Sequence, residues 1–233
     1  MTGDDDNAAQ SRGSFFGRRK GHKLRAHRAA LFETLLPRLA LDITSPAPDL
    51  EALFPGVVAD VRLEIGFGGA EHLIAQAQEF PDIGFIGSEP FIDGMAKALG
   101  EIERHSLDNI RLHDGDASFL LDWLPSASLG RVDLLYPDPW PKRRHWKRRF
   151  VQPDNIARIA RVLRPGAEFR FASDISDYSA WTLERLTRSA NFRWTAERAD
   201  DWRKPWDGFG GTRYEAKAKR EGRAPCYLTF ERR

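Results

Sequence analysis

The sequence predicts an α/β fold built on a doubly wound, mostly parallel sheet of about seven strands, with helices on both faces. Two observations lead to this fold class. From residue 61 onward, short apolar runs rich in β-forming residues alternate with longer segments of helical periodicity. A glycine-rich turn directly follows the first of these runs, as is common where a strand leads into a helix. Because ligands of such sheets bind beyond the carboxyl ends of the strands, we look for chemistry in the segments that follow the strands.

Seven runs are predicted as strands, and they are 61–65, 83–89, 110–113, a fourth that ends near 136, 167–174, 191–197 and 224–231. Helices are predicted between them, from about 70, from about 93, in ASFLLDWL after Asp116, in 152–166 and in 176–189. The helix in QPDNIARIARVLRPG should end at Pro165-Gly166, because this dipeptide stops a helix. This alternation is typical of parallel sheets joined by right-handed crossovers.

Composition divides the chain into three parts. Residues 1–17 are polar and contain glycine, and they are predicted to form a flexible tail. Residues 18–55 hold a basic segment, a helix in ALFETLLPRLAL whose apolar spacing continues across Pro37, and a proline-rich linker. Residues 56–233 form the α/β domain, which is long enough for a sizeable core.

The composition is that of a globular protein, with 41% hydrophobic and 30% charged residues. The net charge is only +2, but the charges are segregated along the sequence. Asp4, Asp5 and Asp6 precede the segment 12–28, which carries seven Lys and Arg residues and no acid. Basic segments of this kind favour a polyanionic partner.

Several classes of protein are disfavoured. The single cysteine, Cys226, lies in a predicted strand and excludes an internal disulfide and a cysteine-based zinc site. No apolar run reaches the ~18 residues of a membrane-spanning helix, and the N-terminus lacks the apolar segment of a signal peptide. We therefore expect a soluble protein of the reducing cytoplasm, without a metal and without a membrane partner.

The turn after the first strand, in LEIGFGGAEHL, contains Gly66, Gly68 and Gly69. Glycine allows a tight turn and a close approach of the backbone to a ligand, so we expect Gly66 and Gly68 to lie at a ligand site. A nicotinamide-dinucleotide fingerprint needs Gly or Ala at the sixth position, where this chain has Glu71. A nicotinamide-dependent oxidoreductase is therefore disfavoured, although many turns of this kind serve structure alone.

Acidic residues stand at the ends of the first three predicted strands, as Glu64, Glu89 and Asp116. A carboxylate accepts two hydrogen bonds at once, which suits the paired hydroxyls of a ribose, and Asp116 is in place to reach an adenine amino group. Acids repel phosphates but tolerate a sulfonium and an ammonium, so the set predicts S-adenosylmethionine as the cofactor. Two structural alternatives stay open, namely an ion pair for Glu64 and a helix cap for Asp116.

The fourth predicted strand leads into Pro137-Asp138-Pro139-Trp140. The basic run that follows consists of Lys142, Arg143, Arg144, Lys147, Arg148 and Arg149. Prolines on both sides fix the backbone around Asp138, Trp140 offers a flat face for a base, and the basic run can contact phosphates. The pattern predicts a nucleic-acid modification site at the cofactor's edge of the sheet. A core tryptophan and a solvated basic patch are the structural alternatives.

The stretch YPDPWPKRRHWKRRFVQP resembles the signature of the bacterial tRNA (guanine-N7)-methyltransferases nearly residue for residue. Further similarity to this family lies in GRRKGHKLR, LEIGFGGAEHL, SDISDY and GTRYEAKAKREGRAPCYLTFER, so the resemblance covers roughly residues 17–233. It implies a Rossmann-like methyltransferase domain over 56–233 that uses S-adenosylmethionine. It also implies a tRNA partner, with methylation at N7 of a guanine in the variable loop, at position 46.

The resemblance assigns cofactor contacts to Glu64, Glu89, Asp116 and Asp138, together with Gly66 and Gly68 of the turn, and it makes Asp138 the catalytic residue. It assigns substrate contacts to Lys142, Asp174, Thr212, Arg213, Tyr214 and Glu215, and it implies no metal site. A helix cap is the structural alternative for Asp174, and an ordinary loop is the alternative for 212–215. Ala70 and Trp146 depart from the family pattern, and the contact of Trp146 cannot be inferred.

Guanine N7 carries a lone pair and no proton, so methylation there needs no general base. We expect catalysis to come from placement of the reactants and from Asp138, which would anchor the guanine and favour the developing cation. The basic segment 18–28 is expected to bind RNA. A methyltransferase acting on an exocyclic base amine and a non-catalytic RNA-binding protein are the alternatives. The tRNA species and the oligomeric state, monomer or homodimer, stay open.

Overall fold

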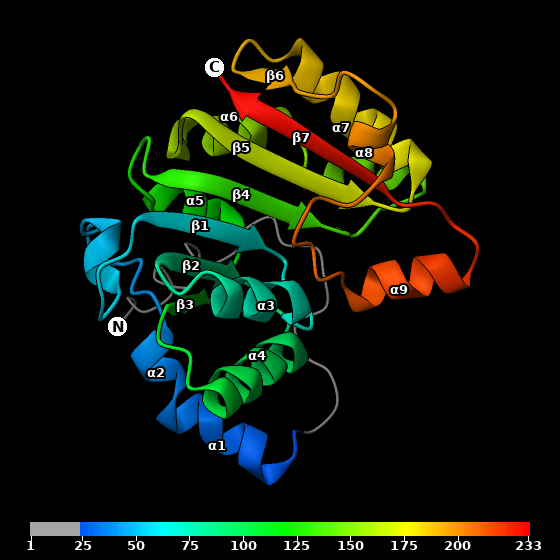
Figure 1. Cartoon of the computed structure of the whole chain (residues 1–233). Coiled ribbons are helices and arrows are strands. Elements are labelled where there is room, and N and C mark those ends of the chain that lie inside the picture. The colour runs from blue at the N-terminus through cyan, green and yellow to red at the C-terminus, as the bar shows by residue number, and fades with distance from the viewer. Residues whose placement is uncertain (1–23) are drawn as a thin grey trace, which may run out of the picture.

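The computed structural model describes residues 24–233, which form one seven-stranded sheet (Figure 1). Its strands are β1 (Asp60–Ile65), β2 (Ile83–Ser88), β3 (Ile110–His113), β4 (Leu129–Leu135), β5 (Leu163–Ser173), β6 (Phe192–Trp194) and β7 (Cys226–Arg232). The strand order is β3-β2-β1-β4-β5-β7-β6, and β7 runs antiparallel to both of its neighbours, whereas the other pairs are parallel. The predicted fold class is confirmed.

Helices cover both faces of the sheet (Figure 1). The α-helices are α1 (Ala26–Thr34), α2 (Leu36–Leu39), α3 (Glu71–Glu79), α4 (Ile92–His105), α5 (Ala117–Trp123), α6 (Pro153–Val162), α7 (Ser176–Arg188), α8 (Asp200–Arg203) and α9 (Arg213–Arg220). Two 3₁₀ helices, η1 (Leu50–Leu53) and η2 (Arg143–Arg148), complete the set in the described part of the chain. None of these helices is long and apolar enough to cross a membrane.

Two apolar cores hold the layers together, one on each face of the sheet. Side chains of α1, α3 and α4, such as Leu31, Leu73 and Leu99, pack with β2 and β3 on one face. The other core joins α5, α6 and α7 to the central strands, with Leu120 and Ile159 among its members. The sheet is thus held rigid from both sides, which fixes the positions of its strand ends.

Strand order reverses between β1 and β4, which lie side by side in the middle of the sheet. The chain leaves β1 toward β2 and β3 on one side, and it leaves β4 toward β5 on the other. A crevice forms at the carboxyl ends of the strands at such a point. The glycine turn after β1 and the proline corner after β4 therefore meet at one place.

The N-terminal segment differs from the expected single helix. Helical structure breaks at Leu35, between α1 and α2. Pro37 lacks an N–H and would clash with the preceding turn of a continuous helix, whereas in the first turn of α2 it is tolerated. The predicted tail 1–17 and the basic residues up to Lys23 lie outside the described part of the chain.

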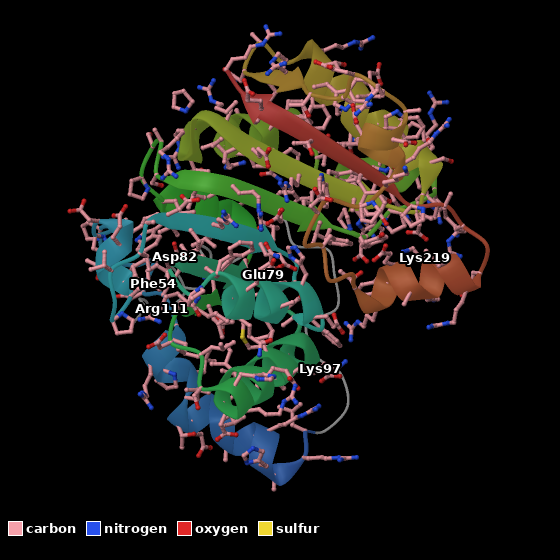
Figure 2. The ribbon with its side chains drawn as sticks, in the orientation of Figure 1. Phe54, Glu79, Asp82, Lys97, Arg111 and Lys219 are labelled. Atoms are coloured by element: carbon pink, nitrogen blue, oxygen red, sulfur yellow. The ribbon has the colours of Figure 1, made fainter. Side chains whose placement is uncertain are left out.

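Two further segments depart from the sequence prediction. The proline-rich stretch before β1 is more than a linker, because Leu50 and Phe54 are buried in the core. Cζ of Arg111 lies 5.1 Å from the centroid of the Phe54 ring (Figure 2). Helix α6 ends at Val162, before the expected Pro165-Gly166 stop. Strand β5 already begins at Leu163 and places this dipeptide in an irregularity opposite Leu129–Arg131.

Candidate active site at the carboxyl ends of the central strands

A cavity of about 600 Å³ opens where β1, β2 and β4 end, which is within the usual size range of small-molecule sites. Among its lining residues are Gly66, Gly68, Ser88, Glu89, Asp116, Tyr136, Asp138, Trp140, Arg148, Arg149, Arg213 and Tyr214. The structure therefore brings together the glycine turn, two of the strand-end acids, the proline corner and the start of α9. Among the sequence-predicted site residues, those that do not line it are Glu64, Lys142, Asp174, Thr212 and Glu215.

The glycine turn places its backbone against the cavity. Gly66 and Gly68 have φ angles of 71° and 57°, in the left-handed region that glycine adopts without strain. A Cβ on Gly68 would also lie 3.2 Å from the ring of Tyr214, so a larger residue would crowd the entrance. Ala70, the departure from the family pattern, adopts a φ of 65° and precedes α3. The turn is preserved with alanine at this position.

Glu89 follows β2 and is held by two backbone amides. Its Oε2 accepts a hydrogen bond from the N–H of Gly68 at 2.7 Å, and its Oε1 accepts one from the N–H of Phe91 at 2.9 Å. Burial raises the pKa of Glu89, although these hydrogen bonds and the positive charge of Arg213 oppose the rise. The carboxylate is thus fixed in orientation beside the glycine turn.

Asp116 caps a helix, which was the structural alternative for this residue, and it also lines the cavity. Its Oδ1 caps α5 by accepting a hydrogen bond from the N–H of Ser118 at 2.9 Å. Its Oδ2 is buried and has no partner within residues 24–233, and the same holds for the hydroxyl of Ser88 in the cavity wall. Buried polar atoms of this kind are usually satisfied by a ligand or water. The cavity wall thus has spare acceptors for a donor-rich ligand such as adenosine.

Glu64 lies behind the glycine turn, on the side of α3. It is buried, and its Oε2 lies 2.8 Å from Nδ1 of His72. Burial opposes a charge on His72, but the neighbouring Glu64 carboxylate outweighs it and raises the pKa of His72. The contact is the ion-pair alternative for Glu64. A direct contact between Glu64 and the cofactor stays a prediction.

The proline corner after β4 is strained at both ends. Tyr136 and Trp140, which flank it, have φ angles of 50° and 43°. Left-handed backbone costs a residue other than glycine about 1–3 kcal/mol and persists where the surrounding structure enforces it. Between them, Asp138 lines the cavity with an exposed side chain, and partial desolvation by the cavity wall raises its pKa. No hydrogen bond to this carboxylate is formed by a described residue, in contrast to Glu89.

Trp140 lines the cavity, but its ring is already in contact with two side chains of η2. The guanidinium of Arg148 lies over it at 4.9 Å, and His145 meets it edge-on at a centroid distance of 5.8 Å. A base that stacks on Trp140 would therefore have to use the face of the ring opposite Arg148, or share it with that guanidinium. The corner has a cation in place beside the predicted stacking position.

The basic run divides into exposed and buried cations. Lys142, Arg143, Arg144 and Lys147 are exposed on η2 or directly before it. Arg149 is buried, so its predicted contact with phosphate is wrong. The role of Trp146, which the sequence left open, is to pack edge-on against Trp181 of α7, at a centroid distance of 5.4 Å. Tryptophan in the run thus anchors it to the fold.

At the start of α9, some side chains face the cavity and others face the protein interior. Arg213 and Tyr214 line the cavity, and Tyr214 is 45% exposed. Thr212 caps the helix by accepting from the N–H of Glu215 at 3.1 Å. Glu215 itself is buried, where it accepts a hydrogen bond from the Tyr227 hydroxyl at 2.5 Å and pairs with Lys219 of the same helix. RNA contacts by Thr212 and Glu215 stay predictions, since their present partners lie within the protein.

Asp174 follows β5 and lies outside the cavity wall. Its Oδ2 accepts from Nε of Arg223 at 2.5 Å. It does not cap α7, whose N-cap residue is Ile175. Asp174 therefore ties the segment before β7 to the end of β5 in this structure, and its contact with RNA stays a prediction.

Sequence reasoning missed Tyr136 and Ser88 as parts of this site, and it gave Arg149 an exposed role that the structure does not support. The ends of β2 and β4 were the available signal for Ser88 and Tyr136, because residues at these ends must border the crevice. No local signal distinguishes Arg149 from the other cations of its run. Within residues 24–233, no group of three or more His, Cys, Asp and Glu residues is arranged to hold a metal ion.

Comparison with solved structures supports the fold. The 16S rRNA methyltransferase KamB superimposes with a TM-score of 0.56 at 19% identity, over 76% of this chain and 89% of that one. TrmN from Thermus thermophilus gives a TM-score of 0.54 at 14% identity, over 79% of this chain and 47% of that one. At such low identities the similarity shows a shared fold and nothing finer.

Sequence comparison reaches further. A family model described as "Putative methyltransferase" matches residues 59–228. Proteins named tRNA (guanine-N(7)-)-methyltransferase from Rhodopseudomonas palustris (strain BisB5) and Bradyrhizobium diazoefficiens are each 61% identical over 98% of this chain, and the matches span 90% and 97% of those proteins. A protein of the same name from Rhizobium meliloti is 60% identical over 96% of this chain and 97% of its own length. The resemblance inferred from the motifs is confirmed, and this chain belongs to the tRNA (guanine-N(7)-)-methyltransferase family.

Proposed function

We propose that this protein methylates N7 of a guanine in tRNA, with S-adenosylmethionine as the methyl donor. The observation that carries the proposal is the position of Asp138, which lines the same cavity as Glu89 and Asp116 and belongs to a corner with a strained residue at each end. Family membership supports the same reaction, because the curated relatives carry that name.

The cavity suits S-adenosylmethionine better than a nucleotide. Its acids would repel phosphates, whereas a sulfonium and an ammonium are attracted to them. Glu89 would accept the ribose hydroxyls with the lone pairs that its two amide partners leave free, and Asp116 would use its unpartnered Oδ2 for the adenine amino group. Gly66 and Gly68 would let the backbone approach the ligand, and Asp138 would face it from the corner.

The bound cofactor supplies an electrophilic methyl group on a positively charged sulfur. Guanine N7 has a free lone pair and no proton, so no side chain has to act as a general base. We infer that Asp138 orients the guanine and favours the positive charge that develops on it, which is electrostatic stabilisation by a group already fixed in place. The stiff corner serves this role because an orienting group must not move when the substrate binds.

Cations beside the cavity would hold the RNA backbone. Lys142, Arg143, Arg144 and Lys147 are exposed at η2, and Lys217 and Arg220 are exposed on α9. Phosphate contacts of this kind provide affinity and register but no sequence preference. Arg213 and Tyr214, at the cavity entrance, are the side chains we expect to contact the target nucleotide.

Two finer assignments belong to this proposal. We place the target guanine in the variable loop, at position 46, because the resemblance to the family implies that address. We also expect the reaction to take place in the cytoplasm, on tRNA after its transcription.

The experiment that tests the function is incubation of the purified protein with unmodified bulk tRNA and radiolabelled S-adenosylmethionine, followed by mass spectrometry of the nucleosides. The expected product is 7-methylguanosine, and mild reduction with aniline cleavage should break the tRNA at the methylated position in the variable loop. A boiled protein and tRNA that already carries the modification are the controls.

Other products would support the alternatives. A methyl group on an exocyclic amine of guanine or adenine would identify a different base methyltransferase. Aniline would then not cleave the tRNA. Failure to transfer any methyl group, together with no heat of S-adenosylmethionine binding in calorimetry, would identify an RNA-binding protein without catalysis.

A further inference from the structure

Arg149 is the last cation of the basic run, and its side chain is fully buried. Arginine is rarely buried completely unless its charge and its donors are satisfied. The other cations of the run are exposed or partly exposed, so the inward position of Arg149 is a specific feature of this segment. This buried guanidinium also lines the wall of the candidate active site.

Three aromatic rings surround the guanidinium. Its Cζ lies 4.9 Å from the ring centroids of Trp146, Tyr178 and Trp181. A cation inside an aromatic box is stabilised by each ring face, and a planar guanidinium also stacks on them. Nη2 is bonded to the carboxylate of Asp177, which is itself half-exposed. The charge is therefore balanced by a partner at the surface.

Two rings of this aromatic box, those of Tyr178 and Trp181, are hydrogen-bonded to the backbone of Val151. The Tyr178 hydroxyl accepts from the N–H of Val151 at 3.3 Å, and Nε1 of Trp181 donates to the carbonyl of Val151 at 2.8 Å. Both rings belong to α7, whose core face packs against β5 and β7. The guanidinium thus sits at a defined position relative to the sheet.

From this position Arg149 reaches the proline corner. Its Nε donates to the carbonyl oxygen of Pro139 at 2.9 Å, and Pro139 directly follows Asp138. This carbonyl belongs to the peptide that joins Pro139 to the left-handed Trp140, where backbone strain has to be balanced by the surroundings. The hydrogen bond therefore joins the rigid α7 side of the molecule to the backbone that carries Asp138.

We propose that Arg149 is a positioning residue, which holds the Asp138 corner in its strained conformation through the carbonyl of Pro139. The inference rests on the function proposed above. Lysine would keep the charge and can pair with Asp177, but it lacks the planar fork that stacks in the aromatic box while donating from Nε. The role belongs to the geometry of the guanidinium and not to its charge.

The test compares Arg149→Lys with Arg131→Lys in the full-length protein. Arg131 is a matched control because it is also buried and paired, with Asp133 at 2.8 Å and Gln76 at 2.6 Å, but it lies in β4 away from the corner. For Arg149→Lys we expect kcat with tRNA to fall about 10- to 100-fold, because small displacements of a reacting group cost this much. KM for tRNA and the Kd for S-adenosylmethionine should stay within about threefold. Arg131→Lys should lower Tm to a similar extent and keep kcat.

A second pair of measurements separates positioning from stability. Arg149→Ala should regain part of its lost turnover when guanidinium ion is added at low millimolar concentration, since the ion can enter the aromatic box, whereas Arg131→Ala should not respond. The proposal is overturned if Arg149→Lys keeps wild-type kcat, or if its kcat falls only in proportion to the fraction unfolded. Formation of 7-methylguanosine by the wild-type protein is measured in the same assay, so a failure of the proposed function is seen separately.

Discussion

The two walls of the cavity hold their acids by different means. On the wall formed by β1 and β2, Glu89 accepts two backbone hydrogen bonds and sits beside glycines that adopt left-handed angles without strain. On the wall formed by β4, Asp138 receives no hydrogen bond from the described residues, and the backbone is strained on both sides of it. Hydrogen bonds to its own oxygens fix the Glu89 carboxylate, whereas the backbone conformation of the corner fixes Asp138.

This difference indicates a division of work. An acid whose oxygens are oriented by amides is suited to recognise a ligand in its ground state. A stiffly held acid with spare acceptor capacity is suited to stabilise charge that appears during a reaction. We therefore assign binding mainly to the Glu89 wall and reaction mainly to the Asp138 wall, and the following predictions test that division.

The largest effect is expected at Asp138. Asp138→Asn keeps the shape of the side chain but removes the charge that favours the cationic guanine, so turnover should fall by about 10²–10³-fold, as for the loss of one preorganised electrostatic group. Rapid-quench single-turnover assays at saturating tRNA and cofactor measure this rate. Asp154→Asn is the matched control, since Asp154 is also exposed and also lines the cavity, but it lies on α6 and not in the corner. Equal losses in both variants would contradict a special role for the corner.

A smaller effect, of another kind, is expected at Glu89. Glu89→Gln would point an amide group at the N–H of Gly68 or Phe91, so the side chain would turn and bind the ribose poorly. We expect the Kd for S-adenosylmethionine to rise about 10-fold, which is roughly 1.4 kcal/mol, with the saturated rate nearly unchanged. Isothermal calorimetry measures the affinity, and Glu79→Gln at the exposed end of α3 serves as control. Loss of rate without loss of affinity would reverse the assignment of this wall.

The smallest effect concerns stability and pH. Burial raises the pKa of Asp138, so the folded state binds a proton more readily than the unfolded state does. This group therefore destabilises the fold above its raised pKa, and the penalty disappears as the pH falls below the pKa of the unfolded chain. Asp138→Asn should raise Tm slightly at pH 7, with a difference that shrinks toward acidic pH. Thermal scans from pH 4 to 8 check this, and a lower Tm for the variant at pH 7 would oppose it.

Much of the fold follows from local patterns. The seven strands and the helices between them carry their periodicity in the sequence, and the proline-flanked corner is a property of four consecutive residues. The misplaced boundaries have physical causes outside the local pattern. Pairing with β4 draws Leu163 into β5 and ends α6 early, and burial against β2 converts Phe54 from a linker residue into a core residue.

Side-chain direction was the part of the site that the sequence could not supply. Arg149 is one of six similar cations, and its inward turn depends on two rings of α7 that come about thirty residues later in the chain. Glu64 and Glu89 both end strands, yet His72 on α3 holds Glu64 on the other side of the turn. Glu215 follows Tyr214, but only the tertiary contact with Tyr227 shows that it is buried. Such choices are made by packing between distant segments.

The division between the two walls is tested most directly by measuring the Kd for S-adenosylmethionine and the single-turnover rate at saturation for the same two variants, Asp138→Asn and Glu89→Gln. We predict that Asp138→Asn loses about 10²–10³-fold in rate with a smaller change in Kd than Glu89→Gln shows, and that Glu89→Gln keeps its rate to within about threefold. A wild-type rate for Asp138→Asn would contradict the account, because no other described feature of the cavity would then explain the strained corner.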